Sequence, residues 1–410
     1  MTSILERCAG LDVHQAVVMA TVRIPDGSGG RAVITETFAS TTHSLLTLRD
    51  WLHAHGVTHV AMESTGVYWK PVYYVLEDGF TLLLVNAQHL KLVPGRKSDV
   101  RDSAWIAQLL ECGLLRSSFV PPAPIRDLRE LTRYRKHQTQ DRTREVNRLH
   151  RVLEDAGIKL SSVATDVMGA SGTAMLQALV AGTTDPNTLA ELAQGKLRKK
   201  LPALREALTG RFRPAHAFLL GQILAKIDFL EETLATLSTQ VEVLLAPFES
   251  SLARLMTIPG VKRRTAETII AETGGDMSRF ATDAHLCSWT GICPGQDESA
   301  GKRRSGKMRK GNPYLRTALI ESGLAASRAA GTALQARYRR VKSHRGHKKA
   351  VVATGHQLLV IAYHILATEN TYQELGPDYF DRRHRDRAIR RRIKQLEQLG
   401  YKVTLEEPAA

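Results

Sequence analysis

Four acidic residues near the start of the chain mark the boundaries of its strand-like and helix-like segments. Asp12 lies within the first apolar run and Glu63 directly follows a second one. Asp99 and Asp102 precede the periodic segment 104–110, and their i, i+3 spacing places both on one face at the start of a helix. Carboxylates gathered from two strands and a helix start provide the oxygen ligands that a divalent cation prefers.

The order of these segments favours a metal site over the ordinary explanations. Taken singly, an Asp at a strand end makes a turn, and Asp99 would simply cap the following helix. Together, an Asp-bearing strand, hairpin-like strands, a helix, a strand ending in Glu and a later Asp-bearing helix follow the ribonuclease H-like (RuvC-like) plan. Two bound ions in such a fold activate an attacking oxygen and stabilise a leaving one in phosphodiester chemistry.

The pattern predicts an α/β domain over residues 1–120. Strands are expected at 11–22, 32–38 and 81–85, and a helix at 45–55, where Gly56 follows. Alternating strands and helices indicate an α/β layer.

A helical arm is predicted for residues 125–250, after the proline-rich linker 121–124. Apolar residues recur at three-and-four spacing in 125–157 and again in 215–246. This spacing predicts an antiparallel helical hairpin or coiled coil. Such an arm is more often structural or dimer-forming than catalytic.

A mainly α C-terminal domain is predicted for residues 251–370, followed by a basic tail, 371–410. The segment around Pro259 and Gly260 joins two helical patterns and resembles a helix–hairpin–helix, in which the turn at Gly260 offers backbone N–H groups to a phosphate. An ordinary glycine-containing helix connection is the alternative.

Charge points to a nucleic-acid partner. The chain has 57 Lys and Arg against 41 Asp and Glu, a formal net charge of +16 and a pI of about 9.8. Residues 302–316 and 337–349 each hold seven Lys or Arg and no acid, and eight more lie in 382–394. The first cluster comprises Lys302, Arg303, Arg304, Lys307, Arg309, Lys310 and Arg316. Solvated helix faces usually mix both signs, so these runs indicate phosphate-contacting surfaces.

Other features suggest a protein of a reducing cytoplasm rather than a secreted or membrane one. No apolar run is expected to cross a membrane, and the N-terminus lacks a signal-type pattern. The four cysteines show neither metal-ligand spacing nor a disulfide framework, so structural zinc is not expected.

Motifs in both halves resemble a known family. The N-terminal motifs are Gly-Leu-Asp-Val-His at 10–14, Met-Glu-Ser-Thr-Gly at 62–66 and Lys-Ser-Asp-Val-Arg-Asp at 97–102; the C-terminal ones are Ile-Pro-Gly-Val at 258–261, Trp-Thr-Gly-Ile-Cys-Pro-Gly at 289–295, Glu-Ser-Ala-Gly-Lys at 298–302 and Lys-Gly-Asn-Pro-Tyr-Leu-Arg at 310–316. The chain resembles the DEDD transposases of the insertion-sequence one-ten group, which are recombinases directed by a bridge RNA encoded in the mobile element.

The resemblance implies a composite active site. Asp12, Glu63, Asp99 and Asp102 match the family's Mg²⁺-binding acids, and Ser299 matches its nucleophilic serine. Attack by serine on a DNA phosphate would give a phosphoserine link that conserves bond energy.

The resemblance also implies donor and target double-stranded DNA, a guide RNA, a homo-oligomer arranged as a dimer of dimers, and a location at the nucleoid. By proximity to the serine, Lys302, Arg303 and Arg304 are expected to neutralise phosphate oxygens.

Alternatives remain at this stage. Ser299 would otherwise be a plain turn residue, and Ser305 is a rival nucleophile. The loop 298–301 reads Glu-Ser-Ala-Gly where many relatives have a Ser-Ser-Gly-Gly-like loop, and 307–310 also departs from the family pattern. The rival functions are a structure-selective, metal-dependent nuclease without serine chemistry, and a nucleic-acid-binding protein with a decayed site.

Overall fold

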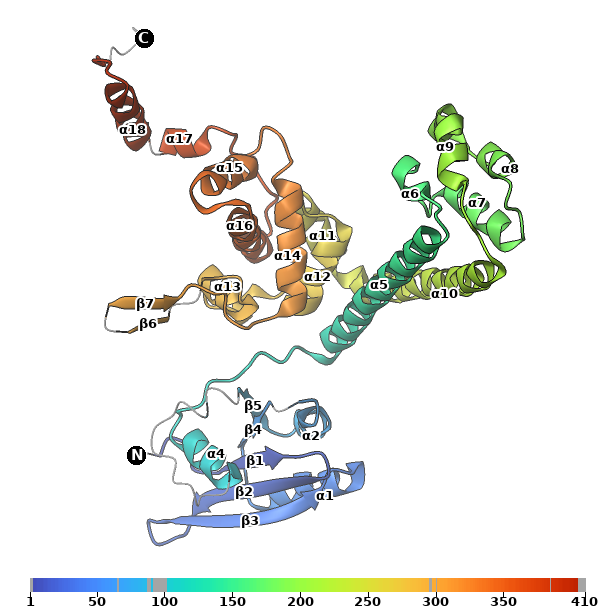
Figure 1. Ribbon diagram of the computed structural model, residues 1–410. Helices are drawn as coiled ribbons and strands as arrows, with labels where there is room; N and C mark the ends of the chain where they lie inside the picture. Colours follow the sequence, from blue (N-terminus) through green and yellow to red (C-terminus); the bar gives the residue numbers. More distant parts are fainter. Residues whose placement is uncertain are drawn as a thin grey trace. The chain divides into compact units, whose positions relative to one another are not determined.

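The structure is a computed structural model that describes residues 3–64, 66–86, 90, 102–294, 297–299, 301–383 and 385–404. The chain forms two compact units, Met1–Val120 and Pro121–Ala410 (Figure 1). The division at Val120 falls next to the proline-rich segment. The boundaries predicted near 250 and 370 stay predictions.

The first unit is built on a mixed five-stranded sheet. Its strands are β1 (Cys8–Val13), β2 (Val17–Pro25), β3 (Arg31–Ala39), β4 (His59–Glu63) and β5 (Thr81–Val85), in the order β3-β2-β1-β4-β5. The first three strands pair antiparallel along the chain, whereas β4 is parallel to both β1 and β5. This arrangement is consistent with a ribonuclease H-like DEDD domain.

Helices cover both faces of this sheet. On one face α1 (Thr42–Ala54) and α2 (Trp69–Leu76) bury Leu48 and Leu76 against alternate strand residues such as Leu11 and Met62. On the other face α4 (Asp102–Glu111) packs Ile106 and Leu109 against Cys8, Ala61 and Val85. The alternation of side chains along a strand assigns odd and even positions to opposite faces.

Gly10 lets α4 lie directly on β1. A Cβ at this position would stand 2.3 Å from both the Ala107 nitrogen and the Ser103 oxygen of the α4 backbone. The Ser103 hydroxyl hydrogen-bonds the Thr21 hydroxyl on β2 at 2.8 Å, and Thr21 is the register partner of Gly10. The start of α4 is therefore fixed over the centre of the sheet.

The other end of α4 is held by buried charge. Glu111 is almost fully buried and forms ion pairs with Arg23 and, at 2.7 Å, with the Arg31 Nε. Because a buried carboxylate needs compensating charge, these pairs fasten the helix end to β2 and β3.

The second unit begins with a helical arm. Helix α5 (Ala123–Asp155) packs against α10 (Pro214–Leu245), and the ion pairs Arg142–Glu231 and Glu145–Lys226 link them. The later residue of α5, Glu145, pairs with the earlier residue of α10, Lys226. The two helices are therefore antiparallel, as predicted. Supercoiled heptad packing stays a prediction.

A small helical cap closes the end of the arm. It contains α6 (Leu160–Val163), α7 (Ala170–Val180), α8 (Pro186–Glu191), η1 (Gly195–Lys200) and α9 (Leu201–Leu208). Its buried residues, including Leu176 and Leu204, form one core with Leu153 and Leu220 of the long helices. Burial of these aliphatic side chains stabilises the cap.

The rest of the second unit is mainly helical. It comprises η2 (Ala246–Phe248), α11 (Glu249–Met256), α12 (Arg263–Thr273), η3 (Met277–Arg279), α13 (Asp283–Thr290), β6 (Asp297–Ser299), β7 (Lys302–Ser305), α14 (Pro313–Ala326), α15 (Ala333–Arg345), α16 (His347–Thr368), α17 (Tyr379–Arg383) and α18 (Arg385–Gln398). Helices α14 and α16 cross closely, because a Cβ at Gly323 would meet the Val351 oxygen at 2.8 Å and one at Gly355 would meet the Leu319 oxygen at 2.7 Å.

Two features differ from the sequence expectations. The segment around Ser299, expected as a loop, is a two-stranded hairpin. The basic tail, for which the sequence predicted no elements, contains α17 and α18. Helix α16 is long and apolar enough to span a membrane by length and composition, which the search for apolar runs missed. Half of that span is buried, and α16 packs on α13, α14 and α15 as a core helix.

Candidate active site and nucleic-acid surfaces

Asp12 and Glu63 lie at the same edge of the sheet. The parallel strands β1 and β4 pair as far as Leu11 and Met62, and the two acids each follow by one position. Neighbouring strands lie about 4.8 Å apart, so the two residues are close neighbours in the backbone. Both share the strand face of Ala61, which is the face that α4 covers.

Asp102 joins this face from the start of α4. It directly precedes Ser103, whose backbone rests on Gly10, two residues before Asp12 on the same face of β1. An acid in the first turn also stabilises the helix by interacting with its dipole, so Asp102 has a structural role as well. The structure thus brings three of the four predicted acids to one edge and one face.

The local contacts of Asp12 are polar and open to solvent. Its Oδ2 lies 3.1 Å from the Nε2 of His14, and the side chains of Asp12 and His14 are 20% and 60% exposed. A carboxylate at this depth can be reached by a solvated cation or a phosphate.

The donor set suits a hard divalent cation in chemistry, since it consists of carboxylate oxygens. Asp99, the fourth predicted acid, falls outside the described residues. Within the described parts of the chain, no three His, Cys, Asp or Glu side chains gather closely enough to hold a metal ion. The metal site therefore stays a prediction that rests on the shared edge.

Ser299 lies at the end of the β6–β7 hairpin. It pairs with Lys302 across a two-residue turn in which Gly301 has φ +72°. A positive φ is readily adopted only by glycine, as the expected tight turn requires. Ser305, the rival serine, pairs with Asp297 at the other end of the hairpin.

Two glycines fix the base of this hairpin. A Cβ at Gly311 would stand 2.5 Å from the Gly291 nitrogen, and one at Gly291, where φ is +73°, would stand 2.8 Å from the Arg309 oxygen. An isolated bridge between Pro294 and Met308 continues the pairing. The hairpin extends from the α13 end of the helical body (Figure 1).

Basic residues follow the hairpin toward α14. Lys302, Lys307, Arg309 and Lys310 are exposed, while the half-buried Arg316 donates to the Arg309 carbonyl at 3.1 Å. Arg303 and Arg304 lie in β7, and their side chains are outside the described part of the structure. Phosphate contact by this group stays a prediction.

Gly260 has a packing role that the sequence did not reveal. Its φ is +87°, and a Cβ there would stand 2.6 Å from the Ala326 nitrogen and 2.7 Å from the Ser322 oxygen. The turn between α11 and α12 therefore fits against α14. The helix–hairpin–helix assignment and a phosphate contact at Gly260 stay predictions.

A buried ionic joint connects the arm to the start of α14, and sequence analysis did not find it. Glu272 is 1% exposed and accepts two hydrogen bonds from Arg133, at 2.8 and 2.7 Å, and one from the Asn312 amide at 2.6 Å. Asn312 also caps α14 by accepting from the Tyr314 and Leu315 nitrogens. The sequence signal that could have revealed this joint is the helical spacing of basic residues in α5 and of acidic residues in α12.

Two buried thiols have raised pKa values. Burial raises the pKa of Cys8 to about 11, with Glu111 nearby adding to the effect. Burial also raises the pKa of Cys287 to about 12, helped by Cys293. All four cysteines are free. Cys8 and Cys287 are therefore neutral, structural residues at physiological pH.

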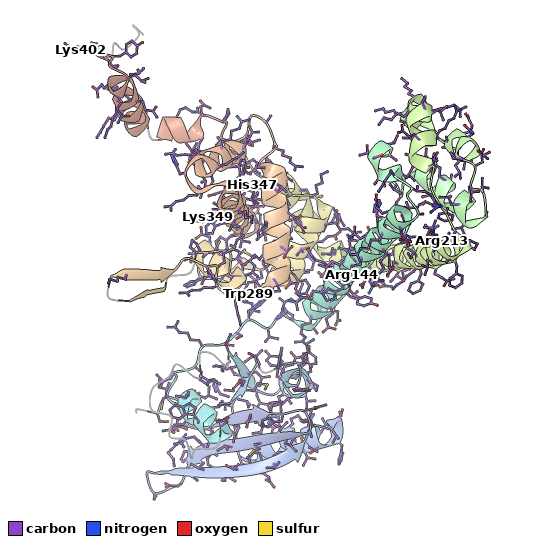
Figure 2. The ribbon with its side chains drawn as sticks, in the orientation of Figure 1. Arg144, Arg213, Trp289, His347, Lys349 and Lys402 are labelled. Carbon is purple, nitrogen blue, oxygen red and sulfur yellow. The ribbon has the colours of Figure 1, made fainter. Side chains whose placement is uncertain are left out.

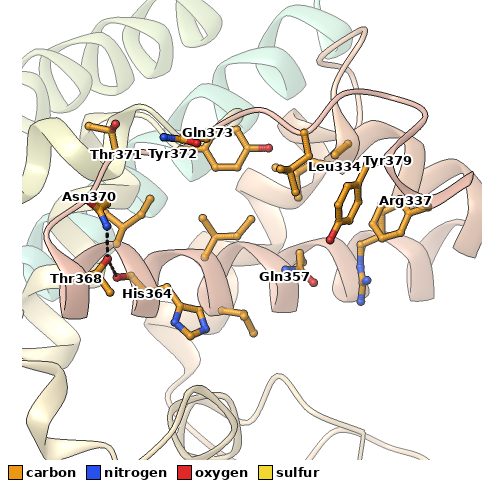
Figure 3. A pocket seen from close by; sticks show the side chains of 16 residues that line it. Leu334, Arg337, Gln357, His364, Thr368, Asn370, Thr371, Tyr372, Gln373 and Tyr379 are labelled. Carbon is orange, nitrogen blue, oxygen red and sulfur yellow. Dashed lines mark hydrogen bonds between the residues drawn. The ribbon is translucent and has the colours of Figure 1, made fainter. Parts of the chain in front are cut away.

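A cavity of about 360 Å³ lies between α15, α16 and the segment that follows α16 (Figure 3). Leu334 and Tyr379 contribute apolar walls, and His364 and Arg337 add polar groups (Figure 3). Burial lowers the pKa of Arg337. None of the described residues that line this cavity belongs to the predicted site.

Two family models match two separate parts of the chain. One, described as a transposase model, matches residues 9–158, which include the acidic edge. The other, described as the transposase IS116/IS110/IS902 family, matches residues 252–339, which include the hairpin. The fold and the matched regions define a transposase.

Relatives agree with this assignment. A protein of Pseudomonas aeruginosa named "Probable family 20 transposase" is 25% identical over 333 residues, which cover 80% of this chain and 89% of the relative. A Streptomyces coelicolor protein named "Insertion element IS110 uncharacterized 43.6 kDa protein" is 27% identical over 162 residues, or 39% of each chain. The chain belongs to the IS110 family of transposases.

Proposed function

We propose that the protein is a DNA recombinase that excises and inserts its own mobile element through a phosphoserine intermediate at Ser299. Transposases cut DNA, and DEDD nuclease domains generally use divalent metal ions. The observation that supports the serine mechanism is the β6–β7 hairpin, in which Ser299 is next to the turn at Gly301. Close packing of Gly291 on Gly311 fixes the base of the hairpin, and exposed cations follow it in sequence.

The serine chemistry follows from that placement. The Ser299 Oγ attacks a DNA phosphorus and loses its proton to solvent, so that one P–O bond forms. The P–O bond to a bridging ester oxygen of the DNA breaks, and that oxygen takes up a proton and leaves as a hydroxyl. A second DNA hydroxyl then attacks the phosphoserine and restores the phosphodiester. Because each step exchanges one phosphate ester for another, no ATP is required. Lys302, Arg303 and Arg304 balance the charge of the non-bridging oxygens.

The acids of the first unit would supply the metal-binding groups. Asp12, Glu63, Asp99 and Asp102 would hold Mg²⁺, which supplies Lewis-acid stabilisation and favours deprotonation of a nearby oxygen. The support for this assignment is that Asp12, Glu63 and Asp102 share one edge and one face of the sheet. His14 contacts Asp12 and orients that carboxylate.

Partners follow from charge and exposure. A folded guide RNA would select donor and target DNA by base pairing, while the protein contacts backbone and shape. The excess of basic residues suits two polyanions at once. Strand exchange needs several active sites, so we propose a dimer of dimers, in which the exposed Phe218, Phe229 and Val243 of α10 contribute to self-association. The bacterial cytoplasm, at the nucleoid, is the corresponding location.

A covalent-adduct assay tests the proposal. The protein is co-expressed with its native flanking DNA, mixed with Mg²⁺ and labelled junction DNA, and separated on a denaturing gel. We expect a protein–DNA adduct in the unmodified protein and in the matched control Ser305→Ala, and none in Ser299→Ala. RNase treatment before DNA addition is expected to abolish the adduct.

The acidic half is tested in the same assay. Asp12→Asn should abolish the adduct, whereas Asp50→Asn, which alters an exposed acid paired with Arg49, should not. Nicked DNA without an adduct, unchanged in Ser299→Ala, would contradict the serine mechanism. That outcome would support the metal-dependent, structure-selective nuclease instead.

A further inference from the structure

A long stretch of the second unit contains no acid. Between Glu321 and Glu369 the sequence has eight Lys or Arg and neither Asp nor Glu. Six of them, Arg339, Arg340, Lys342, Arg345, Lys348 and Lys349, lie where α15 ends and α16 begins, and we name residues 339–349 the α15–α16 corner. The hairpin cluster belongs to a different part of the chain.

The corner is fully presented to solvent. Arg339, Arg340 and every residue from 342 to 349 are exposed. Among the described residues, none of the six cations of the corner forms an ion pair with a carboxylate. Figure 2 labels His347 and Lys349 at the start of α16. The charge of the corner is therefore available to a partner.

The corner is held in one shape. Gly346 turns the chain with φ +77°. The hydroxyl of the buried Tyr338 lies 2.8 Å from the Nδ1 of His347, and Lys342 lies over the Tyr338 ring at 5.8 Å. The two helices are thereby fastened together, so the backbone that carries the cations has one shape before any partner arrives.

Helix stability does not explain the cations of α16. Cations in the last turn of α15 interact favourably with its dipole, but Lys348 and Lys349 stand in the first turn of α16, at the positive end. That turn has no acid, and the N-cap Gly346 provides no side-chain cap. These lysines oppose the local helix, which indicates that they serve an anionic partner.

We infer that the α15–α16 corner binds the phosphate backbone of double-stranded DNA, at a site separate from the residues of strand chemistry. The inference rests on the proposed function only in taking duplex DNA as the substrate. A single strand would need large stacking aromatics, but among the described residues of the corner and its packing partner Tyr338, that tyrosine is 9% exposed and the exposed rings are the imidazoles of His344 and His347. The corner also exposes no large hydrophobic side chain for insertion into a lipid surface. The dense, regular charge of a duplex suits it best.

Salt-dependent binding tests the inference. Full-length protein carrying Ser299→Ala is titrated with a labelled DNA duplex, without Mg²⁺, at several salt concentrations. The corner variant adds Arg345→Gln, Lys348→Gln and Lys349→Gln. The matched control adds Lys196→Gln, Lys199→Gln and Arg211→Gln, which removes the same charge types from exposed positions near the cap of the arm.

We expect the corner variant to bind about 10- to 100-fold more weakly near 0.15 M salt. The slope of log affinity against log salt should fall by about 0.9 for each lost contact, up to about 2.7, while the control keeps both values. The charge-preserving set Arg345→Lys, Lys348→Arg and Lys349→Arg should keep the slope. Melting temperatures are expected to be unchanged or slightly higher in the corner variant.

Three outcomes would overturn the inference. They are an unchanged slope in the corner variant, equal losses in the corner variant and the control, and a loss confined to an RNA hairpin probe with duplex DNA binding intact. Because binding is measured without Ser299 and without metal, a failed adduct assay leaves this result unaffected. A failed corner test likewise leaves the serine mechanism standing.

Discussion

At the residue scale, Glu272 is a buried acid that links two helices of the second unit. It is 1% exposed and joins Arg133 of α5 to Asn312, the cap of α14. Removing one partner of a buried ion pair leaves an uncompensated charge. We predict that Glu272→Gln lowers the free energy of unfolding by about 3–5 kcal/mol.

Chemical denaturation measures this loss, and Glu321→Gln is its control. Glu321 is 68% exposed and lies 3.7 Å from the Lys136 Nζ, so its removal should cost less than about 1 kcal/mol. Equal effects in the two variants would show that the joint contributes nothing beyond a surface pair.

Cys8 makes a second residue-scale prediction, on pH dependence. Its pKa is about 11 in the fold against an ordinary value of 9.0, because burial disfavours the thiolate. The unfolded chain therefore loses this proton first, and the stability contribution is complete below pH 9 and lost as pH rises toward 11.

Urea unfolding at pH 8 to 11 should show a shallower decline in Cys8→Ala than in the unmodified protein. Cys112→Ala, at a half-buried position, should keep the original decline. A decline that is identical in all three proteins would contradict the assignment.

At the element scale, the contact between α4 and β1 determines where Asp102 lies. A Cβ on Gly10 would enter the α4 backbone at 2.3 Å. Backbone cannot yield as a side chain does, so we predict that Gly10→Ala costs about 1–3 kcal/mol and displaces Asp102. Adduct formation should fall at least tenfold at a temperature where the variant remains folded, since about 1.4 kcal/mol of lost transition-state stabilisation is tenfold in rate.

The control is Gly169→Ala, where φ is −72° and a Cβ would meet the Asp166 oxygen at an ordinary 3.4 Å. Thermal unfolding and the adduct assay report both effects. A Gly10→Ala protein with full activity would contradict the role of this contact.

At the element scale, sequence patterns predicted those helices and strands that bury one regular face. Apolar alternation and helical periodicity predicted most of the strands of the first unit, its helices α1 and α4 and the antiparallel arm, because each buries one regular face. Helix α2 was not predicted. The hairpin at Ser299 was expected as a loop, since β6 and β7 are short, polar and cationic and carry no apolar alternation. Its pairing depends instead on the clamp between Gly291 and Gly311, which are 20 residues apart in sequence.

At the scale of the whole molecule, the two units have separate cores. The first unit buries Leu11, Leu48 and Met62 in its own core. We predict that residues 1–120 fold when expressed alone and form no adduct, because Ser299 is absent. A dispersed amide NMR spectrum of the fragment measures the first point, and a collapsed spectrum would contradict it.

The site was predictable in part at this scale. The sequence order of Asp12 and Glu63 led to one sheet edge because parallel strands end together. Asp102 follows from the start of α4, which packs on β1. The glycine contacts at Gly10 and Gly260, the joint at Glu272 and the exposed α15–α16 corner depend on packing between distant segments. Such contacts leave no local pattern in the sequence.

Peptide mapping identifies the residue that carries the DNA in the proposed covalent intermediate at Ser299. The trapped adduct is digested with nuclease and trypsin, which releases Ser299 in peptide 280–302 and Ser305 in the separate peptide 305–307. We expect a nucleotide-derived mass on peptide 280–302, assigned by fragmentation to Ser299. The same mass on Ser305, or on no serine of an active protein, would contradict it.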